Sequence, residues 1–410
     1  MTISHGVAIG SNPERNRIHN RRVVLGVVRA QGQLGRTEIA RRAQLTPQAV
    51  TNIVNELLAE NLLIELGRLR SGRGQPPIQF AVNPDGPMTA GIEIAADHMV
   101  TVLVDLAGRV RAQAVRSLVS TEPQRLLPQL RDEFDALRRS VPGPDAALLG
   151  VGVVMPGPFE IEGMSSVGPA TLPGWRGLDS RTLLSEATGA SVEIENDATA
   201  AAVGERLHGA GRRSSSFCFV YFGVGLGLGV IHEGRPLRGV FGNAGEIGHL
   251  VVTPRGRPAL YGPDGALERF ASLYALRRKL AAAGIAAADV EELQALHDAR
   301  NPVFMAWIAE AADYLAPTIA ALENLFDPET VILGGGLPDS VIDDIILALD
   351  PLPISVASRR DRGLPRVMRG QTGQLTAALG AAALPLLETV TPRLHLAPGP
   401  PQSPPVAALP

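Results

Sequence analysis

Apolar residues recur at helical spacing in three stretches between Arg15 and Glu60, with interruptions at 31–35 and 45–47. The third stretch opens with Thr46 and Pro47, a pair typical of a helix N-cap and first helical position. Its apolar side chains form one stripe at i, i+3, i+4, i+7 and i+8, namely Val50, Ile53, Val54, Leu57 and Leu58. The pattern predicts three helices, the last two in a helix-turn-helix arrangement.

Two short alternating segments follow these helices. They are Leu62–Glu65 and Ile78–Val82, and a loop rich in arginine and glycine, 67–74, joins them. The pattern predicts a wing of two strands. A turn cluster at Asn83–Pro87 then marks a domain boundary. We therefore expect an all-α domain with a wing over residues 14–84.

The rest of the chain mixes strand and helix signals. Thr89–Val104 and Val110–Val119 alternate as a β-hairpin around a turn at Ala107–Gly108. Further apolar strands, with helices between them, are expected at 148–155, 191–194, 217–231 and 330–333. This order predicts an α/β domain in two lobes over 88–390. Residues 1–13 and the proline-rich tail 391–410 have too little apolar content to pack, so we expect both to be disordered.

The composition indicates a soluble protein of several domains, because the 410 residues are 45% hydrophobic and 19% charged. No apolar run reaches the roughly 18 residues of a membrane span, and the N-terminus has no signal-peptide pattern. We therefore expect a cytoplasmic protein with no membrane partner. Its single cysteine, Cys218, excludes an internal disulfide and a multi-cysteine metal site.

Positive charge is concentrated near the N-terminus. The segment from Glu14 to Gly74 contains eleven arginines and five glutamates, whereas the whole chain has a net charge of -3. A basic module inside a nearly neutral chain favours nucleic acid as the partner of that module.

The outward face of the second helix of the helix-turn-helix offers uncharged polar groups. Asn and Gln amides can pair with an adenine edge in the major groove, and a small methyl group can contact thymine. We expect DNA contacts from Arg36, Gln48, Ala49, Thr51, Asn52 and Arg73. Arg73 would reach phosphates or a narrow minor groove from the loop. Two alternatives are a helical bundle with a solvated polar face and an arginine-rich hairpin that serves only solubility.

Five short motifs follow in series along the second domain. They are Glu195–Ala198, Gly223–Gly229, Ala244–His249, Gly262–Glu268 and Val331–Gly336. In order and spacing they resemble those of the ROK family, named for repressors, open reading frames and kinases. With the N-terminal domain the resemblance covers roughly 14–390 and is to the repressor branch, which includes regulators of xylose, glucose and N-acetylglucosamine use. It implies a winged helix-turn-helix fused to a two-lobed, actin-like domain of the sugar-kinase type.

The resemblance also implies a sugar-binding site. In kinases of the family the aspartate that matches Asp197 is the general base toward the sugar hydroxyl, and the residues that match Asn196, Glu246, His249 and Glu268 bind the sugar. Such groups suit a ring of hydroxyls on chemical grounds as well, because an unpaired buried polar group costs about 1–3 kcal/mol. We carry over sugar binding for all five residues. The alternative is that they are ordinary surface or capping residues.

The phosphate side of the site departs from the family pattern. Where the kinases have Asp-x-Gly-Gly-Thr, this chain has Glu93–Asp97, with Ala95 and Ala96 in place of the glycines. Val224 stands where the second phosphate loop has threonine. We expect crowding and charge repulsion to exclude a nucleotide triphosphate, so that the chain has no catalytic residues and is not an enzyme. An ATP-dependent sugar kinase with a DNA-binding appendage is the alternative.

The zinc site of the family is incomplete. Relatives bind zinc through the histidine that matches His249 and through three cysteines, whose positions here are Ala259, Tyr261 and Ala266. We expect no metal and no other cofactor. Thr171 stands where sugar-binding relatives often have asparagine, which would alter the accepted pattern of hydroxyls.

Together these features predict a transcriptional regulator of carbohydrate metabolism, most simply a repressor. It would act as a homodimer or a dimer of dimers on a palindromic operator, with a sugar or sugar derivative as effector. Sugar binding would change the separation or mobility of the DNA-binding domains, and either release from DNA or activation is compatible with the sequence. A further alternative is a DNA-binding protein whose second domain only dimerises.

Overall fold

The computed structural model describes residues 7–8, 13–68, 77–141, 147–156, 172–175, 177–253, 263–287, 289–359, 361–390 and 396–397. The chain divides into two compact units, residues 1–81 with 388–410 and residues 82–387. No helix within the described ranges is long and apolar enough to cross a membrane.

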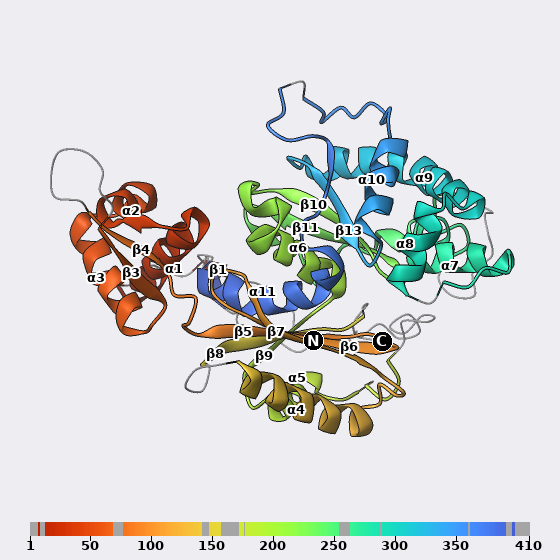
Figure 1. Ribbon diagram of the computed structural model, residues 1–410. Helices are drawn as coiled ribbons and strands as arrows, with labels where there is room; N and C mark the ends of the chain where they lie inside the picture. Colours follow the sequence, from red (N-terminus) through yellow and green to blue (C-terminus); the bar gives the residue numbers. More distant parts are fainter. Residues whose placement is uncertain are drawn as a thin grey trace, which may run out of the picture. The chain divides into compact units, whose positions relative to one another are not determined.

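The first unit is built on three helices and a small sheet (Figure 1). Its helices are α1 (Pro13–Gln31), α2 (Arg36–Ala43) and α3 (Pro47–Ala59). The sheet has the strand order β2–β4–β3, with bounds Leu34–Gly35, Ile78–Val82 and Leu63–Arg68. The helices contact one another pairwise. The buried side chains of this unit include Val24, Leu25, Val28, Ile39, Val50, Val54, Leu57 and Phe80.

Local signals position these elements, with one exception. Thr46 is the N-cap of α3 and accepts a hydrogen bond from the Ala49 amide at 3.3 Å, and Pro47 occupies the first helical position, as predicted. The interruption at 31–35 is not only a break between helices, because its last two residues form β2 against Phe80 and Gln79. A strand of two residues is too short to show an alternating pattern.

A second small pairing joins the ends of the chain. The strands β1 (Val7–Ala8) and β15 (Leu396–Ala397) pair antiparallel. Both dipeptides belong to the segments predicted to be disordered. Apart from Pro13, where α1 begins, the other residues of those segments lie outside the described residues.

The first lobe of the second unit is a five-stranded sheet in the order β7–β6–β5–β8–β9. The bounds are β5 (Met88–Ile94), β6 (His98–Val104), β7 (Val110–Ser117), β8 (Leu148–Val154) and β9 (Val192–Glu195). Strand β5 pairs antiparallel with β6 and parallel with β8. Two helices, α4 (Pro123–Ser140) and α5 (Ser180–Thr188), share an apolar core with one face of the sheet, seen beneath it in Figure 1.

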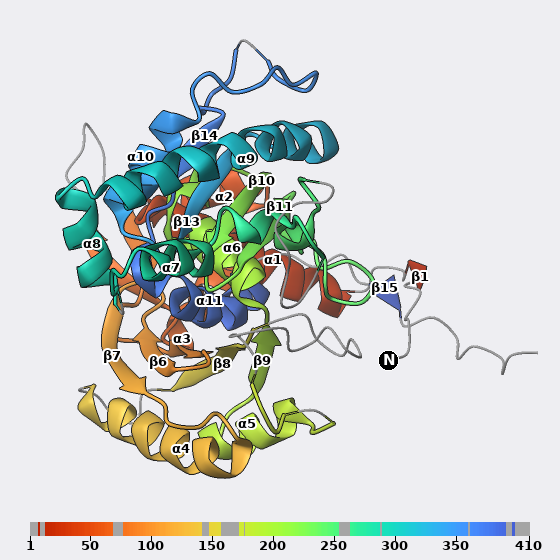
Figure 2. The ribbon, with the colours of Figure 1, turned by 90° about the vertical axis from the view of Figure 1, so that its right-hand side faces the viewer.

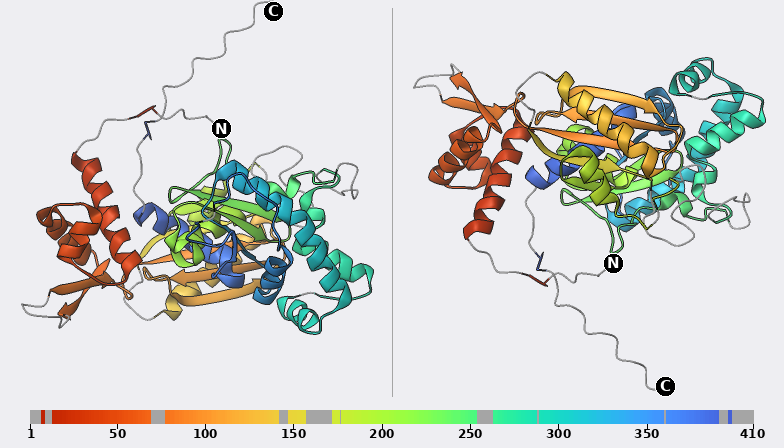
Figure 3. Two further views of the ribbon diagram at one scale, coloured as in Figure 1. Left: turned by 90° about the horizontal axis from the view of Figure 1, so that it is seen from above. Right: turned by 90° about the horizontal axis from the view of Figure 1, so that it is seen from below.

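The second lobe has a sheet in the order β12–β11–β10–β13–β14. The bounds are β10 (Phe217–Phe222), β11 (Leu226–His232), β12 (Arg235–Pro236), β13 (Val331–Gly335) and β14 (Val367–Arg369). Its helices are α6 (Asp197–His208), α7 (Leu273–Ala282), α8 (Val290–Asp298), α9 (Pro302–Phe326) and α10 (Asp339–Ala348). Single 3-10 turns lie at η2 (Ala210–Arg213), η3 (Ile247–His249), η4 (Leu267–Arg269) and η5 (Gly373–Leu375). Helices α7–α10 share one apolar core with the sheet, and Figures 2 and 3 show them gathered on one side of the lobe.

Helix α11 (Thr376–Val390) packs against both lobes. A Cβ atom at Gly91 of β5 or Gly152 of β8 would lie 2.0 or 1.9 Å from a carbonyl oxygen of α11. On its other side, a Cβ atom at Gly380 of α11 would lie 2.3 Å from the carbonyl oxygen of Ala200 in α6. Glycines therefore let the backbone of one helix contact elements of both lobes.

Two segments predicted as single strands are hairpins. Residues 89–104 contain β5 and β6 with a turn at Ala95–Asp97, and residues 217–231 contain β10 and β11 with a turn at Gly223–Gly225. The prediction failed because the turns of three residues are too short to interrupt the strand patterns on either side of them. The strands expected at 148–155, 191–194 and 330–333 are β8, β9 and β13, whereas β14 was not predicted.

Candidate functional site

The outer face of α3 carries three exposed amide side chains. Gln48 and Asn52 lie one helical turn apart, and the Gln48 side chain donates a hydrogen bond to Asn52 Oδ1 at 3.2 Å. Asn55, one turn further, is also exposed. The face therefore presents hydrogen-bond donors and acceptors in a row, the pattern that suits base edges.

The other described residues predicted to contact DNA are half-buried. Ala49 and Thr51 are half-buried, and the Thr51 hydroxyl donates to the Pro47 carbonyl at 2.8 Å. The Arg36 guanidinium lies 4.5 Å above the ring of Phe80 and donates to Asn55 Oδ1 at 3.0 Å. Arg36 is thereby fixed between α3 and β4. Arg73 lies outside the described residues.

Several of the N-terminal arginines are paired. Arg17 contacts Glu56 at 2.8 Å, and Arg21 forms an ion pair with Glu60. Arg41 and Arg42 both bind Glu38 at 2.6 Å, and these hydrogen bonds lower the pKa of Glu38 to about 2. Glu56 and Glu60 each pair with one arginine of α1, whereas Glu38 pairs with two arginines of its own helix, α2.

In the second unit, Asn196 and Asp197 form the junction between β9 and α6. Asn196 is buried and is the N-cap of α6, where its Oδ1 accepts from the Thr199 amide at 2.8 Å. Asp197 Oδ1 accepts from the Ala198 amide at 2.8 Å. Its second oxygen faces the β10–β11 turn, 3.5 Å from the position that a Cβ atom would take at Gly223.

Glu246, His249 and Glu268 come from the turns η3 and η4. His249 Nε2 lies 3.8 Å from Glu246 Oε2. Glu268 is 9% exposed, and its Oε2 lies 3.1 Å from the Cβ position of Gly225 and 3.3 Å from that of Gly248. Because Asp197 and Glu268 both border the Gly223–Gly225 turn, and Gly248 lies between Glu246 and His249 in η3, the structure brings the predicted sugar-binding residues together.

Sequence reasoning missed one member of this group. Glu93, at the end of β5, was considered only as part of a failed phosphate loop. Burial raises the pKa of Glu93 to about 7, opposed by His98 and reinforced by the charges of Asp197 and Asp97. We call Glu93, Asp197, Glu246 and Glu268 the carboxylate cluster. The retained carboxylate in the altered motif was the signal that could have identified Glu93.

Burial, and in part repulsion between neighbouring carboxylates, raises the pKa values of this cluster. Burial raises the pKa of Asp197 to about 6. The pKa of Glu246 rises to about 7 through burial and through the charges of Asp197 and Glu268. Burial also raises the pKa of Glu268, while His249 and Arg269 lower it. A ligand that donates hydrogen bonds to these oxygens would relieve part of this cost.

The segment that matches the first phosphate loop is a tight turn. The Ala95 amide donates to the His98 carbonyl at 2.9 Å, and the Leu118 amide donates to the Asp97 carbonyl at 2.8 Å. The ring of His98 contacts the Asp97 carboxylate at 2.6 Å. The turn therefore uses these groups for its own structure.

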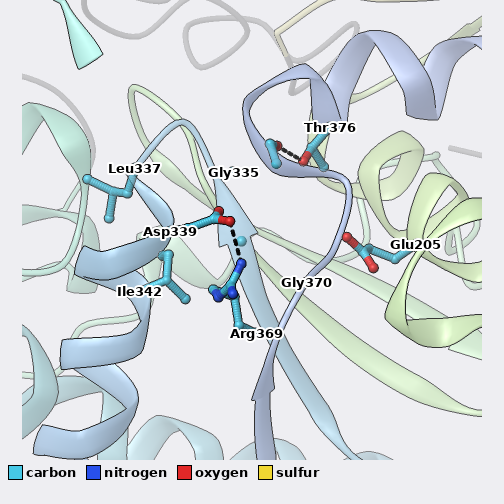
Figure 4. A pocket seen from close by; sticks show the side chains of 10 residues that line it. Glu205, Gly335, Leu337, Asp339, Ile342, Arg369, Gly370 and Thr376 are labelled. Carbon is cyan, nitrogen blue, oxygen red and sulfur yellow. Dashed lines mark hydrogen bonds and ion pairs between the residues drawn. The ribbon is translucent and has the colours of Figure 1, made fainter. Parts of the chain in front are cut away.

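In the second lobe, residues at and after the ends of β13 and β14 line a small pocket of about 10 Å³, shown in Figure 4. Arg369 forms ion pairs there with Asp339 and with Asp343. The buried Glu205 accepts hydrogen bonds from the Gln371 and Thr372 amides, both at 2.8 Å. The pocket has room for about one water molecule.

The positions that match the zinc ligands of relatives, and position Thr171, are only partly described. Ala266 bridges to Val251, whereas Ala259, Tyr261 and Thr171 lie outside the described residues. No group of three or more His, Cys, Asp or Glu residues in the described part of the chain is arranged to hold a metal ion. Cys218 is fully buried in β10, and burial raises the pKa of its thiol to about 12.

Two comparisons concern the full chain and its fold. The xylose repressor of Bacillus subtilis (strain 168) is 26% identical over 370 residues, which cover 89% of this chain and 94% of that protein. The crystal structure of a ROK family transcriptional regulator, a homolog of the Escherichia coli MLC protein, has a TM-score of 0.71 at 22% identity and covers 92% of this chain and 99% of that one. The similarity therefore extends beyond the second unit.

A third comparison concerns the two lobes. A ROK family glucokinase from Streptomyces griseus, solved with glucose and AMPPNP, has a TM-score of 0.60 at 25% identity and covers 72% of this chain and 98% of its own. The second unit thus has the actin-like fold of these sugar kinases. Residues 89–387 match the model of the ROK family, and because this match spans most of the sequence, the chain belongs to the ROK family.

Proposed function

We propose that this chain is a sugar-responsive transcriptional repressor. The xylose repressor to which it is similar is matched over 94% of its length. The observation that carries the proposal is that one chain combines an exposed amide face on α3 with a converging group of carboxylates, an amide and an imidazole in its second unit. The first feature suits DNA and the second suits a polyhydroxylated ligand.

In this proposal the first unit is a winged helix-turn-helix. Helices α2 and α3 are the helix pair, and β3 and β4 are the wing. Gln48 and Asn52 would contact base edges in the major groove, while the fixed Arg36 would support α3 and add positive charge near the phosphates. Two protomers would present two copies of α3 to a palindromic operator.

The second unit would bind an unmodified or derivatised sugar as effector. Asn196 uses its oxygen as a helix cap, which leaves its amide group to donate to a hydroxyl. Asp197, Glu246 and Glu268 would accept hydrogen bonds from hydroxyls. Since donated hydrogen bonds favour the charged form of a carboxylate, the raised pKa values of Asp197 and Glu246 should fall when the sugar binds.

We infer that this site performs no phosphoryl transfer. The Ala95 amide is engaged within its own turn, and the pocket beside Gly334 and Gly335 has room for about one water molecule. An ATP-dependent sugar kinase is the second candidate, because the glucokinase fold is shared. Consumption of ATP in a coupled assay with a panel of hexoses would favour the kinase.

The sugar function is tested by thermal unfolding of the full chain with pentoses, hexoses, amino sugars, polyols and their phosphates. At least one compound should raise the melting temperature, because a ligand that binds only the folded state stabilises it. Asp197→Ala should abolish the rise, and Asp313→Ala, at an exposed position of α9, should keep it. No shift with any compound would contradict a sugar sensor.

The DNA function is tested on the same chain with the double variant Gln48→Ala/Asn52→Ala. Specific operator binding should weaken by about tenfold or more, whereas binding to unrelated DNA should change little, because base contacts carry specificity. Gln124→Ala, at an exposed amide of α4, is the control. Equal loss on both kinds of DNA in a gel-shift titration would argue against base recognition by α3.

A further inference from the structure

The segment between α10 and β14 projects from the second lobe (Figures 1 and 2). It carries exposed apolar side chains. We call residues 351–359 the projecting loop. Ile354 is 95% exposed and Val356 is 86% exposed. The loop extends from α10 and rests on α9. Leu347 of α10 is 72% exposed, and Leu325 of α9 is 74% exposed. Four large apolar side chains are thus exposed to water in this region. A group of this kind indicates an interaction surface.

The projecting loop is firmly attached to the lobe. Asn324 Oδ1, next to Leu325 on α9, accepts hydrogen bonds from the Ser355 hydroxyl at 2.8 Å and the Val356 amide at 3.2 Å. Arg366 donates to the Pro353 carbonyl at 2.8 Å, and the fully buried Glu323 binds Arg366 at 2.5 Å. Ile354 is therefore presented on a fixed backbone. A fixed apolar side chain loses little freedom on binding, which favours association.

A pocket of about 390 Å³ lies at the base of the loop. Its apolar lining comes from the end of α10, the start of the loop and β14, and comprises Ile346, Leu349, Pro351, Leu352 and Val367. An apolar projection and an apolar pocket thus lie side by side on one surface. This is the arrangement that a two-fold symmetric contact requires, because each copy must offer both parts to its partner.

The charges on this surface are also complementary. Arg359 is exposed on the projecting loop, where its side chain donates to the Ala357 carbonyl at 3.1 Å. Asp350 is exposed and lines the pocket together with Arg366, whose guanidinium is paired with the buried Glu323. In a two-fold contact Arg359 of one copy would approach Asp350 of the other, twice in each dimer.

We propose that the projecting loop and its neighbouring pocket form the contact surface between two copies of this chain, with Ile354 of each copy entering the pocket of the other. The inference deepens the proposed function, which requires two protomers on one operator. The proposed contact surface concerns assembly alone. If it is wrong, sugar binding and DNA binding can still be observed, so its failure is distinguishable from a failure of the proposed function.

The first test is sedimentation of the full chain with Ile354→Asp. The wild type should be a dimer or a higher assembly of dimers at micromolar concentration, and the variant should dissociate at least about tenfold more readily. Val115→Asp, at a 66% exposed position of β7, introduces the same charge elsewhere and should leave assembly unchanged. A monomeric wild type, or an Ile354→Asp variant that assembles like the wild type, would overturn the proposal.

The second test uses charge reversal and does not depend on a destabilising residue. Asp350→Arg and Arg359→Asp should each weaken assembly, because each places like charges against each other in the contact. The double variant Asp350→Arg/Arg359→Asp restores opposite charges and should recover most of the wild-type association. Additive weakening in the double variant would contradict the proposed approach of the loop to the pocket.

Discussion

At the scale of single residues, the carboxylate cluster is the feature that most distinguishes this chain from a generic globular protein. Glu93, Asp197 and Glu246 all have pKa values raised by burial, and Glu93 and Glu246 are raised further by the charge of Asp197. Holding several carboxylates together costs folding free energy at neutral pH. Such a cost is tolerated where the groups serve a ligand.

Glu93→Gln should therefore stabilise the folded chain at high pH. The unfolded glutamate titrates near 4.5 and the folded one at about 7, so the folded state holds its proton more tightly. The destabilising effect is absent below about pH 4.5, grows between pH 4.5 and 7, and is complete above pH 7. We expect a gain of roughly 1–3 kcal/mol at pH 8 that fades toward pH 5, measured by urea unfolding across that range.

Glu291→Gln is the matched control for this measurement. It makes the same change at an exposed position of α8, away from the cluster, and should alter stability by less than about 0.5 kcal/mol at any pH. A pH-independent gain for Glu93→Gln would mean that loss of charge is not the cause.

At the scale of elements, α11 is the part whose packing decides how the two lobes are held. Gly91 of β5, Gly152 of β8 and Gly380 of α11 each allow backbone to contact backbone. Close contacts of this kind leave no room for rearrangement around an added side-chain atom. The position of α11 is thus coupled to α6, the helix that begins at Asp197.

Gly380→Ala should destabilise the second unit. Alanine favours the helix by up to about 1 kcal/mol, but its Cβ atom would lie 2.3 Å from the Ala200 carbonyl, so α11 must shift. We expect a net loss of about 1–3 kcal/mol in chemical unfolding, with a reduced response to the effector.

Gly363→Ala provides the comparison, because a Cβ atom there meets no atom within 4 Å. That variant should be neutral or slightly stabilising. If both variants had the same stability, the tight packing of α11 on α6 would not be limiting.

At the scale of the whole molecule, the proposed repressor needs energetic coupling between its sugar and operator sites. Such coupling is reciprocal, so the factor by which sugar changes operator affinity equals the factor by which operator DNA changes sugar affinity. We expect a common factor of roughly 5–150, measured by titrating each ligand with and without the other. A factor near one in both directions would indicate two independent binding sites on one chain.

Ile354→Asp adds a second measurement at this scale. If assembly through the projecting loop places two α3 helices on the operator, the variant should bind an isolated half-site as the wild type does and lose affinity mainly for the full palindrome. An equal loss on half-site and palindrome would place its effect in the DNA-binding unit itself.

Much of the architecture was predictable because its causes are local. The Thr46–Pro47 start of α3 and its apolar stripe depend on residues within one or two turns, and the structure confirms both. The motifs containing Asn196, Asp197, Glu246 and Glu268 were visible as short runs. By contrast, the hairpins at 89–104 and 217–231 were not, because their short turns do not interrupt the strand pattern that runs through each segment.

The sequence alone determined the kinds of element in each unit, the family resemblance and the residue types available for a polar site, since these follow from spacing and chemistry along the chain. Only the tertiary structure placed Glu93 beside Asp197, closed the Ala95–His98 turn on itself, engaged Arg36 with Phe80, and left Ile354 exposed next to an apolar pocket. These features arise from contacts between distant segments. Their geometry depends on how sheets and helices pack, which no local pattern specifies.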